Sequence, residues 1–257
     1  MKVIFNHKSK AFIEIGSAKI YYEEIGNPQK QPLIFLHGGF GNMEDFNGII
    51  HLLENEYHII GIDSRGQGKS TLGNEGLTYA ILEKDVETII NTLNLKNPII
   101  IGFSDGGITA LRLASYKDLN FAKLILIGTS WHSKSLEKSK VFLKAITAEK
   151  WKQKFPDTFE TYQSINPKPD FEKLTNEIVK MWIDETATGH PNDSVQKINC
   201  PTLIVRGDKD HLISKQSSFE LSEKIESANL ANIPFCGHEV YSEQPNILMS
   251  IINQFLK

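Results

Sequence analysis

The sequence predicts an α/β protein with a mostly parallel central sheet. Short runs of apolar, largely β-branched residues recur along the chain, and segments with helical periodicity follow most of them. Strands that alternate with helices pair in parallel through right-handed crossovers. The apolar runs are continuous and do not alternate with polar residues, which indicates a sheet that helices cover on both faces.

The N-terminal strands are predicted to be antiparallel. Residues 11–16 and 18–25 alternate apolar and polar side chains around Gly16-Ser17, a pattern typical of a hairpin. The first parallel strand is predicted at 33–36 and ends in the run His37-Gly38-Gly39-Phe40-Gly41. Glycines grouped in this way indicate that the backbone approaches another group closely. The run lacks the lysine and the hydroxyl residue that end a phosphate-binding loop.

The next elements continue the alternation. We expect a helix over 43–53 and a strand over 58–62, and this strand leads into a loop that begins with Asp63-Ser64-Arg65. An ion pair between Asp63 and Arg65 is expected to brace that loop. A helix over 78–93 follows, because its apolar residues repeat on one face.

The most informative stretch is the turn at Ser104. An apolar strand over 99–103 precedes it and a helix over 108–116 follows, so the serine lies between strand and helix. Gly102 and Gly106 leave room for a strained backbone at this point. A serine held there is a candidate nucleophile at a helix N-terminus, where negative charge is favoured. The alternative is a glycine-rich loop that contains a serine by chance.

The alternation of strands and helices stops after a further strand at 124–127. Residues 130–190 contain no strand-like run, and helices are predicted at 141–146, 155–165 and 171–183. We therefore expect a core domain of residues 1–129 and 191–257 with a helical cap inserted at 130–190. All three tryptophans lie in this insertion, and Trp131 and Trp182 are expected to line an apolar pocket with Phe40. The alternative is that these aromatic residues only pack the insertion onto the core.

The last third of the chain returns to the strand and helix pattern. A strand over 201–206 precedes a loop with Asp208 and Asp210, and a helix over 215–225 and a strand over 228–233 follow. His238 stands in the next loop, before a final helix over 244–256. Both loops follow parallel strands, so they end at the sheet edge where Ser104 is expected.

Composition excludes several classes of partner. The chain has 28 basic and 31 acidic residues spread without blocks, and its net charge is -3, so neither nucleic acid nor a membrane surface is expected as a partner. Two cysteines, Cys200 and Cys236, make no disulfide framework and no metal-ligand spacing, and we expect no metal and no cofactor. Residues 1–12 lack the apolar stretch of a signal peptide, and no segment is long enough to span a bilayer, so a cytoplasmic location is expected.

The motifs together resemble the α/β-hydrolase superfamily. HGG, DSRGQGKS, GFSDGG, GDKD and GH occur in that order over nearly the whole chain. The resemblance implies Ser104 as nucleophile, His238 as base and Asp210 as the acid, with Asp208 as its rival. It also implies an oxyanion hole formed by the backbone N–H groups of Asp105 and Gly39, with Phe40 as the fallback.

Residue 105 suggests a narrower hypothesis. The string SDGGITAL is similar to that of the valacyclovir hydrolase (biphenyl hydrolase-like) group, where an aspartate at this place is linked to recognition of an α-amino group. The resemblance implies that the carboxylate of Asp105 pairs with the ammonium of an amino-acid ester. The alternative is that Asp105 points away and caps the helix.

The expected activity is therefore hydrolysis of an ester, or a related acyl bond, of a small molecule through an acyl-enzyme. A serine at 104 argues against the dehalogenase and epoxide hydrolase branches, which use aspartate there. Carbon-carbon or peptide hydrolysis by the same triad stays open, although Phe40 interrupts the HGGPG pattern of proline iminopeptidases. A non-catalytic protein of this fold that only binds a ligand is the alternative from another class.

Overall fold

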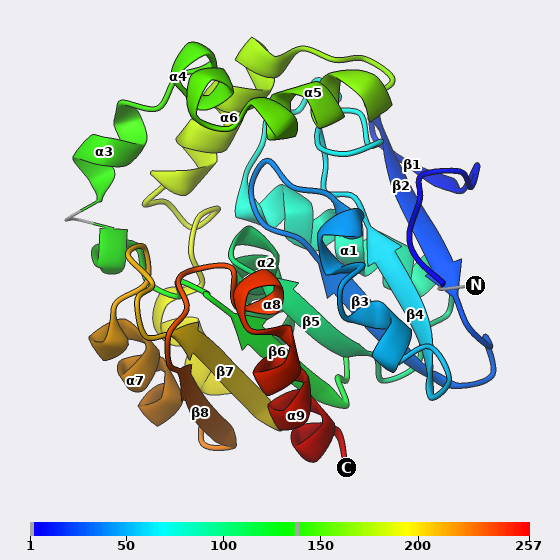
Figure 1. Ribbon diagram of the computed structural model, residues 1–257, viewed down its shortest axis with the longest axis vertical. Helices are drawn as coiled ribbons and strands as arrows, with labels where there is room; N and C mark the ends of the chain where they lie inside the picture. The colour runs from blue at the N-terminus through cyan, green and yellow to red at the C-terminus, as the bar shows by residue number, and fades with distance from the viewer. Residues whose placement is uncertain (1–2, 137–138) are drawn as a thin grey trace.

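The central sheet of the computed structural model, which describes residues 3–136 and 139–257, has the predicted topology (Figure 1). Within the described residues, eight strands pair in the order β1-β2-β4-β3-β5-β6-β7-β8. β2 is antiparallel to both β1 and β4, and all other neighbours are parallel. This confirms a mostly parallel sheet with antiparallel N-terminal strands. The strands are β1 (Phe12–Ile15), β2 (Ala18–Ile25), β3 (Gln31–Leu36), β4 (Tyr57–Ile62), β5 (Ile99–Phe103), β6 (Lys123–Ile127), β7 (Thr202–Gly207) and β8 (Ala228–Ile233).

The register brings the predicted site loops to one edge of the sheet. Leu36 at the end of β3 pairs with Gly102 near the end of β5, and Gly207 at the end of β7 pairs with Ile233 of β8. These strands run in parallel, so the loops that follow them leave the sheet on the same side. The loops that begin at residues 37, 104, 208 and 234 therefore meet there.

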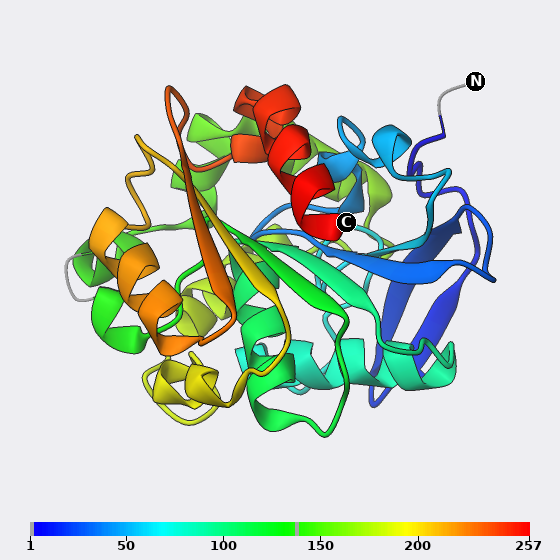
Figure 2. The ribbon, with the colours of Figure 1, turned by 90° about the horizontal axis from the view of Figure 1, so that it is seen from below.

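Helices cover both faces of the sheet (Figure 2). One face packs against α1 (Tyr79–Thr92), α2 (Asp105–Tyr116), α7 (Lys215–Lys224) and the 3-10 helix η4 (Asn192–Lys197). The other face packs against α9 (Pro245–Leu256) and the 3-10 helices η1 (Met43–Phe46) and η2 (Ile50–Leu52). Both layers are buried and apolar, as the continuous apolar strands predict.

The helix predicted over 43–53 is wrong, because the structure has two short 3-10 helices there, η1 and η2. The break falls at Asn47. Its side-chain oxygen accepts from the backbone N–H of Phe5, and its amide donates to the carbonyl of Phe5. The chain therefore bends at Asn47, where it binds the N-terminal segment that precedes β1.

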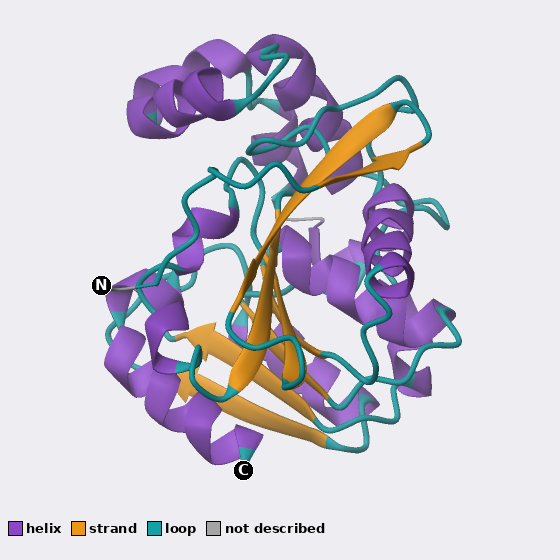
Figure 3. Cartoon of the chain, turned by 90° about the vertical axis from the view of Figure 1, so that its right-hand side faces the viewer, coloured by secondary structure: helices purple, strands orange, loops and turns teal. Residues whose placement is uncertain are grey.

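Four helices lie together at one end of the molecule (Figures 1 and 3). They are α3 (Lys140–Lys144), α4 (Ala148–Lys154), α5 (Pro156–Ile165) and α6 (Phe171–Trp182), and we call them the cap helices. α4 was not predicted from the sequence, because Trp151 is its only large apolar residue. Two short helices complete the described elements, η3 (Ser133–Leu136) and α8 (Val240–Glu243).

The loop between α5 and α6 is anchored on the core by one buried amide. Asn166 donates from Nδ2 to the carbonyls of Gly68 and Ser70, at 2.9 and 3.0 Å, and more weakly to that of Gly66, at 3.4 Å. These carbonyls belong to the turn that follows β4. In the part of the chain that the structure describes, no helix has the length and apolarity needed to cross a membrane.

Candidate active site

Ser104 lies on a strained turn between β5 and α2. Its φ of 49° and ψ of -114° are unusual for a residue with a side chain. A Cβ on Gly102 would lie 2.6 Å from the carbonyl oxygen of Gly106, and a Cβ on Gly106 would overlap the carbonyl of Leu36. The glycines that flank the serine are therefore needed for the close approach of strand, turn and helix, as the motif predicts.

Asp210 and His238 are in direct contact. Oδ2 of Asp210 lies 2.8 Å from Nδ1 of His238, while Oδ1 accepts from the backbone N–H groups of Leu212 and Ile213 at 2.9 Å each. Burial alone would raise the pKa of Asp210, but these hydrogen bonds outweigh it and hold the pKa below its usual value. The charged carboxylate therefore orients the imidazole with Nδ1–H toward it and leaves Nε2 available.

Asp208 does not take this position. Its backbone N–H donates to the carbonyl of Ile233, and its Oδ1 has no hydrogen-bond partner among the described residues. His211 lines the pocket described next without any part in the contact between Asp210 and His238. The structure thus brings Asp210, not its rival, to the histidine.

Ser104 and His238 line one pocket of about 660 Å³ beneath the cap helices. The glycine loop, residues 38–41, lines the same pocket. Among the described residues, no hydrogen bond joins Ser104 Oγ to His238. A larger hollow, of about 930 Å³, lies between η4 and α7 and contains none of the predicted site residues.

The glycine loop is a tight turn with free backbone donors. The N–H of Gly41 donates to the carbonyl of Gly38 at 3.2 Å, and Phe40 has a φ of 62°. His37 fixes the turn, since its Nδ1–H donates to the carbonyl of Gly38 at 2.7 Å and its Nε2 accepts from the N–H of Ser64 at 2.9 Å. Burial lowers the pKa of His37, which suits a neutral ring in these two roles.

The backbone N–H groups at this edge that have no partner among the described residues include those of Gly39, Phe40 and Asp105. The N–H of Asp105 is the first of helix α2, where no intrahelical acceptor exists. These are the groups that the family resemblance implies as donors of an oxyanion hole.

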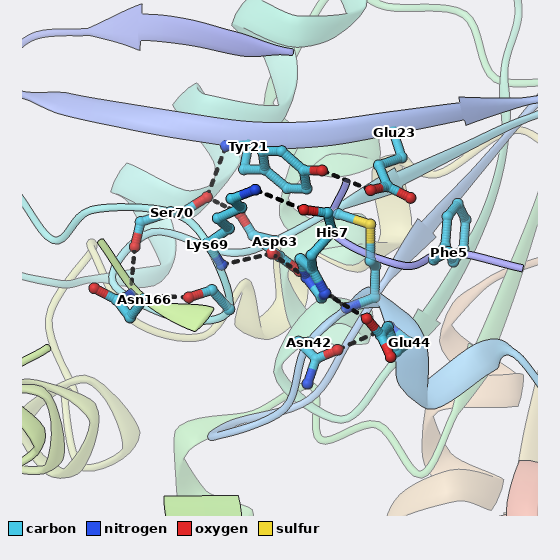
Figure 4. Close-up of polar contacts among 12 residues, drawn as sticks. Phe5, His7, Tyr21, Glu23, Asn42, Glu44, Asp63, Lys69, Ser70 and Asn166 are labelled. Carbon is cyan, nitrogen blue, oxygen red and sulfur yellow. Dashed lines mark hydrogen bonds and ion pairs between the residues drawn. The ribbon is translucent and has the colours of Figure 1, made fainter. Parts of the chain in front are cut away.

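A charged cluster that the sequence does not indicate holds the segment that follows the glycine loop (Figure 4). Asp63 accepts from the N–H groups of Met43 and Lys69, and its Oδ2 also lies 2.7 Å from Nε2 of His7. Nδ1 of His7 lies 2.6 Å from Glu44. Burial alone would lower the pKa of His7, but its hydrogen bonds to the two carboxylates outweigh burial and raise the pKa to about 9.

The predicted ion pair between Asp63 and Arg65 is wrong. Arg65 instead bonds both oxygens of Asp85 on α1, at 2.6 and 2.7 Å, and also contacts Glu75. Asp63 instead contacts His7, which lies in the N-terminal segment before β1. Neighbouring residues in the sequence thus point to opposite sides of the loop and serve different elements.

The carboxylate of Asp105 points away from the pocket, as the second sequence interpretation has it, but it contacts Tyr79 and Trp182 and forms no cap of helix α2 among the described residues. This direction does not support the predicted contact with a substrate ammonium group. Oδ1 accepts from Tyr79 Oη at 2.7 Å, and Trp182 Nε1 donates to Oδ1 and Oδ2 at 2.9 and 2.8 Å. The residue is 4% exposed and does not belong to the described lining of the pocket. Burial raises the pKa of this carboxyl group.

Aromatic residues form the cap side of the pocket. Phe40 stacks on Trp151 with ring centres 4.0 Å apart and meets Trp182 edge-on at 5.7 Å. Phe40 and Trp182 line the pocket, and so does Trp151, which the sequence did not single out. The expectation for Trp131 needs correction. This residue is 4% exposed, is absent from the described lining, and donates its indole N–H to the carbonyl of Ser217 on α7.

Comparisons with known proteins show the family to which the chain belongs. The chain is 28% identical to the AB hydrolase superfamily protein YisY of Bacillus subtilis, over 92% of this chain and 94% of that protein. It is 22% identical to the serine hydrolase BPHL of Mus musculus, over 97% and 87%. A thermophilic esterase from Thermogutta terrifontis superposes with a TM-score of 0.73 at 19% identity, over 96% and 98%, and shares the fold. A family model described as alpha/beta hydrolase fold matches residues 31–169, more than half of the chain. The protein therefore belongs to the α/β hydrolase fold family of enzymes.

Proposed function

We propose that the protein is a serine hydrolase that cleaves an ester bond of a small molecule through an acyl-enzyme. The contact between Asp210 and His238, at the pocket that Ser104 also lines, carries this proposal. An unassisted serine hydroxyl is a weak nucleophile near neutral pH, and an imidazole oriented by a carboxylate is the general base that activates it.

The proposed reaction has two halves. His238 Nε2 takes the proton of Ser104 Oγ as this oxygen attacks the ester carbonyl, and the oxyanion accepts from the N–H groups of Asp105 and Gly39, or of Phe40. The imidazolium then returns the proton to the departing alcohol, which leaves an acyl-serine. Water attacks the acyl group with the same base, and the acid is released as serine regains its proton.

The aromatic wall of the pocket supports an apolar group on the substrate. Phe40, Trp151, Phe171 and Trp182 face it, and aromatic walls favour an apolar acyl or alcohol group. The names of two relatives, serine hydrolase and esterase, agree with ester hydrolysis. Both oxygens of Asp105 already accept hydrogen bonds from protein donors, so the geometry favours simple esters over amino-acid esters.

Burst kinetics test the proposal. Wild-type protein mixed with p-nitrophenyl butyrate is expected to release p-nitrophenol in a burst equal to the enzyme concentration, and Ser104→Ala is expected to lose it. A fluorophosphonate probe should label the wild-type protein and not the variant. Wild-type protein that gives neither burst nor adduct would contradict the proposal and favour the ligand-binding alternative. Adduct formation without ester turnover would favour carbon-carbon or peptide hydrolysis.

The amino-acid ester hypothesis has its own test. Hydrolysis of an aminoacyl p-nitrophenyl ester is compared with that of its des-amino analogue in the wild type and in Asp105→Ala. The geometry predicts the same ratio of the two rates in both proteins. A ratio that falls in the variant would restore the role of Asp105 as the partner of an ammonium group.

A further inference from the structure

We propose that Trp182 of the cap helices is a positioning residue for the oxyanion hole, a role that rests on the proposed function. Its indole contacts the residues on both sides of the hole, Asp105 and Gly39. The cap helices would then contribute to the rate of the chemical step as well as to the shape of the pocket.

The first contact fixes Asp105. Trp182 Nε1 lies 2.9 and 2.8 Å from the two carboxylate oxygens, and Tyr79 Oη lies 2.7 Å from Oδ1. The donors come from the end of α6 and the start of α1, while Asp105 begins α2. The backbone N–H proposed to bind the oxyanion belongs to this same residue. Fixing the carboxylate therefore restricts the direction of that N–H.

The second contact supports the glycine loop. A Cβ on Gly39 would lie 2.7 Å from Asp105 Oδ2 and 2.7 Å from Trp182 Cζ2. Gly39 therefore packs closely against both the carboxylate of Asp105 and the indole ring of Trp182. The ring of the next residue, Phe40, also packs against the indole. One tryptophan thus supports the loop that carries the second donor.

Trp182 is itself held by the core. The chain that follows α6 is tied to α1, because Ala80 donates its N–H to the carbonyl of Thr188 at 3.0 Å. It is also tied to α2, because Arg112 donates from Nη1 to the carbonyls of Gly189 and Ala187, at 2.6 and 3.1 Å. The indole is therefore fixed relative to the nucleophile turn.

Stability alone does not account for this arrangement. A carboxylate with only neutral donors is costly to bury, and an apolar residue at position 105 would avoid the cost. The simpler alternative is that Trp182 only lines the pocket and contacts substrate. The two roles differ in what they require of the side chain. A residue that only contacts substrate requires the aromatic ring, whereas a positioning residue requires the hydrogen bond from the indole N–H to Asp105.

Trp182→Phe separates the two roles, because it keeps an aromatic ring and removes the donor. The measurements are kcat and KM for p-nitrophenyl butyrate, and Ki for a trifluoromethyl ketone, whose adduct with serine carries an oxyanion. Complete loss of one oxyanion donor costs roughly 10²- to 10³-fold in kcat, so a displaced donor is expected to cost about tenfold. We expect kcat to fall and Ki to rise by that factor, with KM within about twofold of the wild type.

Trp131→Phe is the matched control. It removes one indole hydrogen bond, to the carbonyl of Ser217, outside the described lining of the pocket. Its kcat, KM and Ki are expected to equal those of the wild type. Tyr79→Phe removes the other donor to Asp105 with a smaller change, and kcat and Ki should shift in the same directions. It decides the question if Trp182→Phe does not fold.

Two results would overturn the inference. One is a folded Trp182→Phe, or Tyr79→Phe in its place, with wild-type kcat and Ki. The other is an increase in KM alone for Trp182→Phe, which would assign the indole to the pocket wall. Failure of the proposed function is a separate result, because the wild-type protein would then give neither a burst nor a fluorophosphonate adduct.

Discussion

The buried imidazole of His7 makes the stability of the fold depend on pH in the alkaline range. Its pKa is about 9 in the folded protein, against 6.5 for an unperturbed histidine. Because the pKa is raised on folding, the imidazolium contributes its full stabilisation below pH 6.5, and this contribution is lost as the pH rises through 9. The side chain is 5% exposed, and its partner Asp63 is fully buried.

The size of the effect follows from the same change in pKa. An increase from 6.5 to about 9 corresponds to about 3 kcal/mol in the free energy of unfolding. This is an upper value, because the second partner, Glu44, is 42% exposed and water weakens its attraction. His7→Gln keeps a donor of similar reach but has no proton to release.

Urea unfolding of the wild type and His7→Gln at several pH values between 6 and 10 measures this contribution. The wild type is expected to be more stable at pH 6, and the difference should shrink by up to about 3 kcal/mol by pH 10. Other titrating groups cancel in the difference. Glu44→Gln is the matched control, since it keeps an acceptor for Nδ1–H but removes one negative charge, and its loss of stability should begin at lower pH. A difference between wild type and His7→Gln that stays constant over this range would refute the reasoning.

Three further substitutions test other parts of the site. Asp210→Asn should lower kcat for p-nitrophenyl butyrate by about 10⁴-fold, because the amide cannot orient or stabilise the imidazolium, and a loss below tenfold would contradict the role of Asp210. Gly39→Ala should lower kcat by at least about tenfold, since the added methyl meets Asp105 and Trp182; wild-type kcat would show that the loop tolerates the methyl group. Asn166→Ala should lower the free energy of unfolding in urea by about 1–3 kcal/mol, because the buried carbonyls of Gly68 and Ser70 lose their donor, and an unchanged midpoint would contradict that estimate.

The parts of the site predicted correctly from the sequence are those set by local pattern. The strands read as continuous apolar runs, and their parallel order puts the following loops at one edge of the sheet. The turn at Ser104 needs small neighbours that the sequence displays as Gly102 and Gly106. Asp210 could be placed near His238 for the same reason, because each stands in a loop after a late strand.

The contacts that were missed join residues far apart in the sequence. His7 lies 37 residues from Glu44 and 56 from Asp63, and no periodicity links a single histidine to such partners. Trp131 and Trp151 lie in the same predicted insertion, residues 130–190, and are the same residue type, so composition could not tell which of them lines the pocket. The partners of His7 and the choice of the tryptophan that lines the pocket depend on the three-dimensional fold.

The glycine loop shows why such distant contacts matter for catalysis. Its proposed donors are backbone N–H groups, which every residue except proline carries. The type of residue alone therefore does not set where these donors lie. Their position is set instead by what surrounds the loop. His37 holds the loop at the turn after β3, Asp63 and His7 hold the segment that follows it, and Trp182 supports it from the cap helices. Residues 7 and 182 never need to touch substrate for their substitution to change the geometry of the hole. Substitutions at these two positions should therefore affect kcat more than KM, even though they lie far from Ser104 in the sequence.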